Sequence, residues 1–314
     1  MTDLLQLPAV QSGAGISVIA PASFAQPARI DAGLEQLRGL GFGPLISQHA
    51  LERGPLFFAG TTEQRLIDLH SAFTDETTRL VMCLRGGYGS NYLLDGLDLE
   101  LIRNHPKPFF GYSDLTGLQL HLLDRVGLTA FHGPMVAADF YLEDGVHLPS
   151  FLAALAGQTY RVGAVEGLRV LKPGRSEGLV QGTLYGGCLS ILVSLLGTPF
   201  EPQTEGKLLF LEDTGAKPYQ VDRMLWQLRQ AGKIEGVSGI VFGEMLDCVS
   251  PGASSSLLEE VILRALEDFD GPIGFGLRSG HVSRQNVTLM FGVQAELRTG
   301  PLAELLVNYQ AVTK

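Results

Sequence analysis

The chain has 314 residues and a mass of 33.8 kDa, more than one hydrophobic core usually organises, so two domains are expected. A composition of 45% hydrophobic and 18% charged residues is typical of a globular protein and excludes long disorder. The formal net charge of −10, without a Lys/Arg run, disfavours a nucleic-acid partner, because phosphate binding requires a basic face.

The first half of the chain alternates predicted strands with predicted helices. Strands are expected at 15–21, 79–87, 107–113 and 128–135, and helices at 30–40, 60–75, 93–105 and 114–127. This alternation predicts βαβ units and a parallel sheet, whose ligands bind at the carboxyl ends of the strands. No apolar run approaches the ~18 residues of a membrane span. The apolar start also lacks the preceding positive charge of a secretory signal, so we expect a cytoplasmic protein that binds no membrane.

The regular alternation of predicted strands and helices stops after residue 155, and the second half follows a different order of elements. We predict a first domain at 1–155, a linker at 156–178 and a second domain at 179–314. The second domain is expected to hold a turn at 180–187, helices at 188–197, 219–232 and 254–269, strands at 207–213, 237–245 and 271–281, and a closing hairpin at 287–300.

Three predicted strand ends carry residues suited to nucleophilic catalysis. Ser113 stands between a strand and a helix, where the N–H groups of a helix start can stabilise an oxyanion, although its GYSDL segment matches only half of a G-x-S-x-G elbow. From this segment alone, the alternative that Ser113 or Asp114 is simply an N-cap is favoured. Glu212 and Asp213 end a buried strand, where they are either site residues or the start of a solvated loop, and His281 follows a glycine turn.

Glycine is over-represented, at 39 of 314 residues against a usual frequency of about 7%. One cluster, RGGYGS at 85–90, lets backbone amides approach a ligand but is neither a Walker A loop nor G-x-G-x-x-G. Three scattered cysteines and seven scattered histidines show no spacing typical of a disulfide framework or a metal site, so we expect no metal and no cofactor.

Ser, carboxylate and His occur in the order of one type of hydrolase triad, which by itself is weak evidence. Four motifs in the right order strengthen it: RGGYGSNYLLDGLD, FFGYSDLTGLQLHLL with HGPM, LLFLEDTGAKPYQVDRMLWQL and GLRSGH. Together they resemble the LD-carboxypeptidases, the family of muramoyltetrapeptide carboxypeptidases and microcin C self-immunity peptidases, over roughly residues 15–300. The resemblance implies an N-terminal flavodoxin-like or Rossmann-like parallel sheet, a smaller β-rich C-terminal α/β domain, and a homodimer.

Carried over by position, the resemblance makes Ser113 the nucleophile, Glu212 the acid and His281 the base. It also makes the backbone N–H groups of Gly87 and Asp114 the oxyanion donors. The chain departs from the family pattern at Cys188, where an Asn is common, and at Lys217, where a Glu is common; both positions bear on the substrate pocket. For the substrate, we expect Arg85, Tyr88 and Arg284 to contribute to binding, since Arg suits a terminal carboxylate.

The implied reaction is cytoplasmic release of the C-terminal D-alanine from murein tetrapeptide in cell-wall recycling, through an acyl-enzyme. Two alternatives remain open at this point. One is hydrolysis of a microcin C-like aminoacyl-nucleotide antibiotic by the same triad. The other is a non-catalytic Rossmann-like protein that binds a phosphorylated ligand with the glycine cluster.

Overall fold

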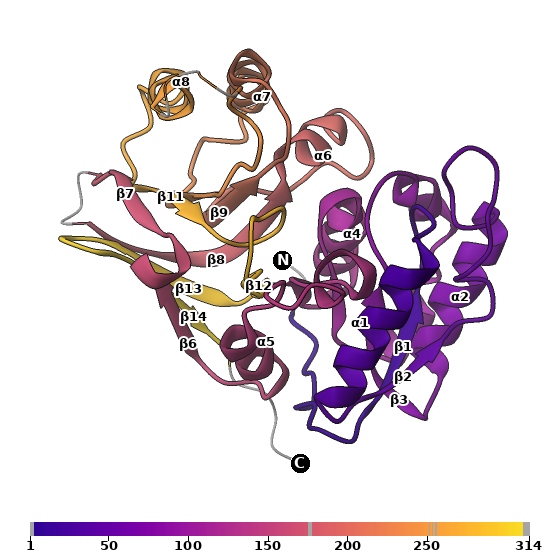
Figure 1. The fold of residues 1–314 in the computed structure, drawn as a ribbon. Coiled ribbons are helices and arrows are strands. Elements are labelled where there is room, and N and C mark those ends of the chain that lie inside the picture. The colour runs from indigo at the N-terminus through magenta and orange to yellow at the C-terminus, as the bar shows by residue number, and fades with distance from the viewer. Residues whose placement is uncertain (1–2, 175–177, 251, 253, 255, 310–314) are drawn as a thin grey trace. The chain divides into compact units, whose positions relative to one another are not determined.

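A computed structural model describes residues 3–309 apart from 175–177, 251, 253 and 255. The chain divides into two compact units (Figure 1). The first unit comprises Met1–Gln158, Arg284–Gly292 and Tyr309–Lys314, and the second comprises Thr159–Ser283 and Val293–Asn308. Residues 284–292, predicted in the second domain, therefore belong to the first unit.

A six-stranded sheet organises the first unit, in the order β12-β5-β4-β3-β1-β2. Its strands are β1 (Gly15–Ile19), β2 (Gly43–Ile46), β3 (Thr78–Cys83), β4 (Phe109–Gly111), β5 (Ala130–His132) and β12 (Leu289–Phe291). All neighbours are parallel except β12, which runs antiparallel to β5. The order 2-1-3-4-5 is that of a flavodoxin-like fold, so the predicted N-terminal architecture is confirmed.

The helices of the first unit cover both faces of this sheet. They are α1 (Pro27–Gly39), α2 (Thr62–Thr74), α3 (Leu99–Asn104), α4 (Thr116–Val126) and α5 (Leu148–Leu155), with shorter turns η1 (Ser90–Gly96), η2 (Ser113–Leu115) and η3 (Val136–Phe140). Because crossovers are right-handed, reversal of strand order at β1 puts α1 on one face of the sheet and α2, α3 and α4, which contact one another in chain order, on the other. The gap between the carboxyl ends of β1 and β3 is thus the switch point at which such sheets bind ligands.

Local sequence signals explain why these elements form where they do. Thr61 accepts a hydrogen bond from the Gln64 amide while the Gln64 side chain accepts from the Thr61 amide, a capping box that starts α2. Gly127, at φ +79°, ends α4. The central strand β3 reads as a continuous apolar run because it is covered on both faces.

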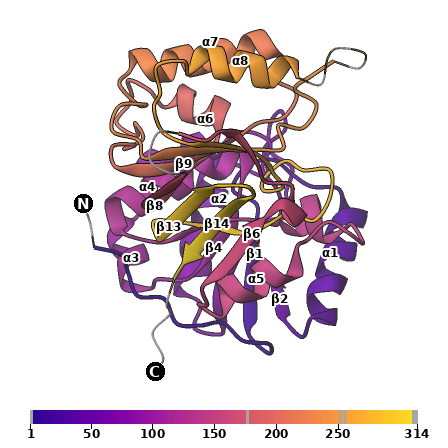
Figure 2. The ribbon, with the colours of Figure 1, turned by 90° about the vertical axis from the view of Figure 1, so that its left-hand side faces the viewer.

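An eight-stranded mixed sheet organises the second unit, in the order β6-β14-β13-β8-β9-β10-β11-β7. Its strands are β6 (Tyr160–Gly163), β7 (Arg169–Lys172), β8 (Leu179–Cys188), β9 (Lys207–Glu212), β10 (Gly239–Gly243), β11 (Ile273–Leu277), β13 (Gln294–Thr299) and β14 (Ala303–Asn308). Only β8 to β11 are parallel to one another. The described part of the unit also holds the helices α6 (Leu189–Ser194), α7 (Pro218–Gln230) and α8 (Leu257–Ala265) and the short turn η4 (Ala164–Glu166). Figure 2 shows α7 beside α8 on one face of the sheet.

Three sequence predictions are wrong in the second half. The segment 156–178 is not a linker, because β6 and β7 lie in it and pair with β14 and β11. Residues 180–187 belong to the ten-residue strand β8 rather than to a turn. The expected hairpin at 287–300 does not form, because β12 pairs with β5 in the first sheet while β13 pairs with β8 and β14.

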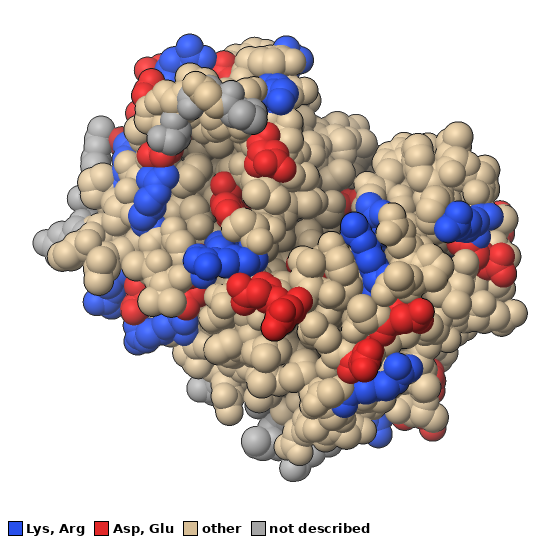
Figure 3. All heavy atoms as spheres, viewed as in Figure 1, with Lys and Arg blue, Asp and Glu red and all other residues tan. Residues whose placement is uncertain are grey.

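The described residues contain no helix that is both long and apolar enough to cross a membrane. On the face drawn in Figure 3, the described Lys and Arg side chains are interspersed with Asp and Glu and form no continuous basic surface.

Lys107 ties the end of α2 to the sheet. Its buried ammonium donates to the carbonyls of Ala72 and Asp75 and to Thr78 Oγ1, and burial lowers the pKa of Lys107 to about 8. The unfolded chain keeps this proton up to a pH near the ordinary value of 10.5. The Lys107 contribution to the free energy of unfolding should therefore rise from pH 8 to 10.5, because the unfolded state binds more protons there.

Urea unfolding of the wild type and of Lys107→Met across pH 7 to 10.5 measures this contribution. The wild type should gain at most about 3 kcal/mol relative to the variant over the window. Parallel stability curves for the two proteins would contradict the burial of a titrating ammonium at this position.

Candidate active site

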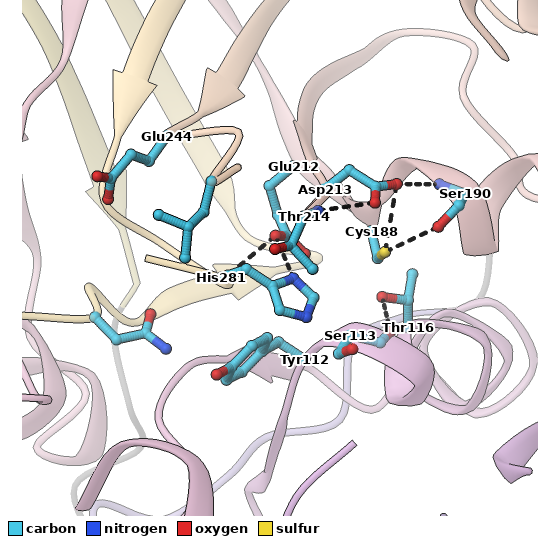
Figure 4. Close-up of polar contacts among 12 residues, drawn as sticks. Tyr112, Ser113, Thr116, Cys188, Ser190, Glu212, Asp213, Thr214, Glu244 and His281 are labelled. Atoms are coloured by element: carbon cyan, nitrogen blue, oxygen red, sulfur yellow. Dashed lines mark hydrogen bonds and ion pairs between the residues drawn. The ribbon is translucent and has the colours of Figure 1, made fainter. Parts of the chain in front are cut away.

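Ser113 occupies a strained turn between β4 and α4. Its φ of +66° is in the left-handed region, which costs a residue with a Cβ about 1 kcal/mol or more. Thr116 Oγ1 donates to the Ser113 carbonyl at 2.8 Å and so fixes the turn (Figure 4). The alternative of a simple N-cap is wrong, because Leu115 is the N-cap of α4 and no side chain caps it. The turn has the geometry of a nucleophile elbow although Leu115 replaces the second glycine.

The glycine loop, which we define as Arg85–Ser90, follows β3 and passes directly over this turn. A Cβ on Gly86 would lie 2.8 Å from Ser113 Cβ and 3.1 Å from Ser113 Oγ. Only glycine permits that approach, so the loop backbone can reach the atoms around the serine hydroxyl.

Two backbone amides at these strand ends are available to a ligand. Within the part of the chain that the structure describes, neither the Gly87 amide nor the Asp114 amide has a hydrogen-bond acceptor. They belong to the loops that follow the neighbouring strands β3 and β4. Unpaired N–H groups near a nucleophile are what an oxyanion hole requires.

Ser23, in the loop after β1, holds the glycine loop from the side of the switch point. Its Oγ accepts a hydrogen bond from the Tyr88 amide at 3.1 Å, and its own amide contacts the Gly86 carbonyl at 3.4 Å. The Tyr88 amide therefore already has an acceptor. The amide of Gly87, which lies between Gly86 and Tyr88, is left without one. The sequence analysis missed Ser23, although a small polar residue after the first strand of a doubly wound sheet is a usable signal.

Glu212 and His281 form a hydrogen-bonded pair in the second unit, in which the carboxylate is buried (Figure 4). Glu212 ends β9 and is 0% exposed, and its Oε2 accepts from the His281 backbone amide at 3.0 Å and from His281 Nδ1 at 2.8 Å. The carboxylate therefore keeps the hydrogen on Nδ1 and leaves Nε2 as the ring nitrogen that can take a proton. His281 keeps about a fifth of its side chain exposed.

Gly280 allows this pair to form. Its φ is +85°, and a Cβ on it would lie 2.5 Å from Glu212 Cδ and 2.8 Å from Glu212 Oε2. A side chain at this position would push the carboxylate out of its place. The glycine before the histidine is thus a packing requirement of the Glu212–His281 pair.

Asp213 has a different task from its neighbour. Its carboxylate accepts from the amides of Ser190 and Thr214, both at 2.8 Å, and so joins the start of α6 to the end of β9 (Figure 4). Both acids are buried, so the alternative of a solvated loop is wrong. Nearby Cys188 is a neutral thiol, because burial, reinforced by Glu212 and Asp213, raises its pKa well above the ordinary value.

The residues expected to bind substrate lie on the first unit. Arg85 and Arg284 are exposed, and Tyr88 is 41% exposed beside the rings of Phe57 and Tyr92. Ser113, Gly87 and Asp114 also belong to this unit, whereas Glu212 and His281 belong to the second. In the described part of the chain, no group of three or more His, Cys, Asp or Glu is arranged to hold a metal ion.

Comparison with protein families gives two matches in chain order. Residues 16–133 match the LD-carboxypeptidase N-terminal domain and residues 181–297 match the LD-carboxypeptidase C-terminal domain. A probable murein peptide carboxypeptidase of Bacillus subtilis is 38% identical over 93% of this chain and 91% of the relative. A murein tetrapeptide carboxypeptidase of Pseudomonas aeruginosa is 35% identical over 90% of this chain and 92% of the relative.

Solved structures give the same result for the fold. A muramoyltetrapeptide carboxypeptidase from Oxalobacter formigenes is 28% identical with a TM-score of 0.82, over 95% of this chain and all of that one. An MccF-like protein from Bacillus anthracis is 26% identical with a TM-score of 0.87, over 98% of this chain and all of that one.

The Glu212–His281 pair can be tested through Gly280. Gly280→Ala should displace the carboxylate, because the added Cβ overlaps it, and the downfield proton resonance of His281 Nδ1–H should be lost or shifted in the NMR spectrum. Gly232→Ala is the matched control, since Gly232 also has a positive φ of +70° but has open space around it. If both variants keep the resonance unchanged, the described position of the Glu212 carboxylate against Gly280 is wrong.

Proposed function

Since this chain belongs to the LD-carboxypeptidase family, we propose that it releases the C-terminal D-alanine from murein tetrapeptide with Ser113, His281 and Glu212 as a catalytic triad. The observation that carries the proposal is the hydrogen bond between the buried Glu212 carboxylate and His281 Nδ1, which supports the histidine as a base acting through Nε2. The strained turn at Ser113 adds support, because it offers a serine hydroxyl beside two unengaged amides.

In the first step, Ser113 Oγ attacks the carbonyl carbon before the terminal D-alanine while His281 Nε2 takes the hydroxyl proton. Glu212 stabilises the imidazolium that results and keeps its orientation. The negative oxygen of the tetrahedral intermediate accepts hydrogen bonds from the Gly87 and Asp114 amides, each worth about 3 kcal/mol in such sites.

In the second step, His281 gives the proton to the leaving nitrogen, the C–N bond breaks and D-alanine departs. Water, activated by the same histidine, then attacks the ester on Ser113 and frees the shortened peptide. A carboxypeptidase must also bind the free carboxylate of its substrate. Arg85 and Arg284 supply exposed guanidinium groups for this purpose, and Tyr88 adds an exposed ring next to Gly87.

We place this reaction in the recycling of murein peptides in the cytoplasm, with the enzyme as a homodimer and without a metal or other cofactor. The names of the Bacillus subtilis and Pseudomonas aeruginosa relatives support the substrate class. The resemblance to the family supports the dimer and the compartment.

A second candidate is hydrolysis of an aminoacyl-nucleotide antibiotic of the microcin C type. The likeness to the MccF-like protein from Bacillus anthracis favours it. The murein relatives are the more similar in sequence, so we expect kcat/KM for the tetrapeptide to exceed that for an aminoacyl sulfamoyl adenosine by at least about 10²-fold, which is about 3 kcal/mol. A higher kcat/KM for the nucleotide in the same assay would reverse the order of the two candidates.

Removing the nucleophile gives the most direct test of the triad. Ser113→Ala should lower the rate of D-alanine release by about 10⁴-fold or more, and Glu212→Gln by about 10⁴-fold, because the histidine loses its tautomer and orientation. Chromatographic quantification of D-alanine released from purified murein tetrapeptide measures both rates.

Asp213→Asn serves as the control, since Asp213 is also a buried carboxylate but holds the start of α6 rather than the histidine. Its kcat should stay within about tenfold of the wild type, and EDTA should leave the wild-type rate unchanged. Full activity of Ser113→Ala, or inhibition by EDTA that zinc restores, would contradict a serine mechanism.

A further inference from the structure

The Asp114 side chain clamps the turn at the nucleophile to the glycine loop. Its Oδ2 accepts a hydrogen bond from the Ser90 amide at 2.8 Å, and Ser90 Oγ donates to the Asp114 carbonyl at 2.6 Å. Asp114 is 5% exposed and Ser90 is 1% exposed, so both bonds are shielded from water. Two reciprocal bonds between the same residues fix both the distance and the orientation of the two loops.

Ser23 and Asp114 both hold the glycine loop. Ser23 binds Gly86 and Tyr88, the neighbours of Gly87, and Asp114 binds Ser90, three residues after Gly87, so the segment that carries the Gly87 amide is held on both sides by Ser23 and again at its C-terminal end by Asp114. A loop containing three glycines has high conformational freedom and does not hold such a position by itself. The precision of the Gly87 amide therefore comes from these outside anchors.

A buried cation compensates the charge of the Asp114 carboxylate. The Arg65 guanidinium, 3% exposed, donates from Nη1 to the carbonyls of Gly89 and Pro21 at 2.8 and 2.9 Å. Burial raises the pKa of the Asp114 carboxyl, and hydrogen bonds from Ser90 together with the charge of Arg65 oppose that shift. Arg65 thus has two effects. It holds the Gly89 carbonyl of the glycine loop, and its charge favours the ionised form of Asp114, which holds the Ser90 amide.

We propose that the Asp114 carboxylate is a positioning residue that sets the separation of the two oxyanion donors, the Gly87 amide and its own amide. This assignment rests on the triad and the oxyanion hole of the proposed function. It adds a role for the Asp114 side chain, which takes part in neither of them. Donors must lie 2.7 to 3.1 Å from the developing oxyanion, so a loop displaced by about 1 Å loses most of their effect. The loss falls on the transition state and therefore on kcat rather than on KM.

The test compares Asp114→Ala and Asp114→Asn with Asp68→Ala in the full-length protein. Asp68 is a matched control, because it is also a buried carboxylate of the first unit, and its hydrogen bonds go to the amide and Nδ1 of His49 at 2.9 Å rather than to the glycine loop. For D-alanine release, Asp114→Ala should lower kcat by about 10- to 10²-fold with KM within about threefold. Asp114→Asn should recover most of that loss, since its amide oxygen can still accept from Ser90.

Asp68→Ala should lose thermal stability and keep kcat within about threefold of the wild type. Equal losses of kcat in the two alanine variants, or wild-type kcat in Asp114→Ala, would overturn the positioning role and leave the triad intact. Absence of D-alanine release by the wild type, or full activity of Ser113→Ala, would instead overturn the proposed function.

Ser90→Ala keeps the inference testable if Asp114→Ala does not fold. It removes the bond to the Asp114 carbonyl and leaves the amide that Asp114 binds. The kcat of Ser90→Ala should fall by about 2- to 10-fold. In the double variant Ser90→Ala/Asp114→Asn, the fold-loss of kcat should differ from the product of the two single losses, because the two hydrogen bonds join the same pair of residues. Unchanged kcat in Ser90→Ala, or strictly multiplicative losses, would contradict the clamp.

Discussion

The hydrogen-bonded pair of Glu212 and His281 is the interaction on which the proposed chemistry depends. A carboxylate with no exposed surface is costly to bury unless it is paired, and here one oxygen binds both the backbone amide and the ring of the same histidine. That double contact fixes the tautomer and the ring orientation together. It also explains Gly280, because the carboxylate fills the space that any side chain there would need.

Parallel strands are the reason that functional groups from distant parts of the chain gather in each unit. In the first unit, the carboxyl ends of β1, β3 and β4 bring Ser23, the glycine loop and Ser113 to one edge, next to the reversal of strand order. In the second unit, the ends of β9 and β11 bring Glu212 to His281 across a sequence separation of 69 residues. The rigid sheet supplies the position, and the loops after it supply the chemistry.

The sequence predicts β1, β3, β4, β5, β9, β10 and β11, because continuous apolar runs ending in glycine, serine or acidic residues are local signals. It does not predict β2, β6, β7 and β14, and it reads β8 as a turn. It does predict a strand at β12 but not its partner, because β5 lies far away in the chain. Nor does it separate Glu212 from Asp213. Both follow the same apolar strand, and only the tertiary structure sends one carboxylate to His281 and the other to the start of α6. The roles of Ser23 and Ser90 as anchors of the glycine loop are not predicted either, because they depend on contacts with residues 65 and 24 positions away in the chain.

A phosphonate ester of murein tetrapeptide, with phosphorus in place of the scissile carbonyl carbon, tests most directly whether a serine on one unit and a histidine on the other act together. Peptide mapping by mass spectrometry should find the wild-type protein phosphonylated at Ser113, and His281→Ala should react at least about 10²-fold more slowly. Modification at another residue, or equal rates of labelling in the two proteins, would contradict the triad.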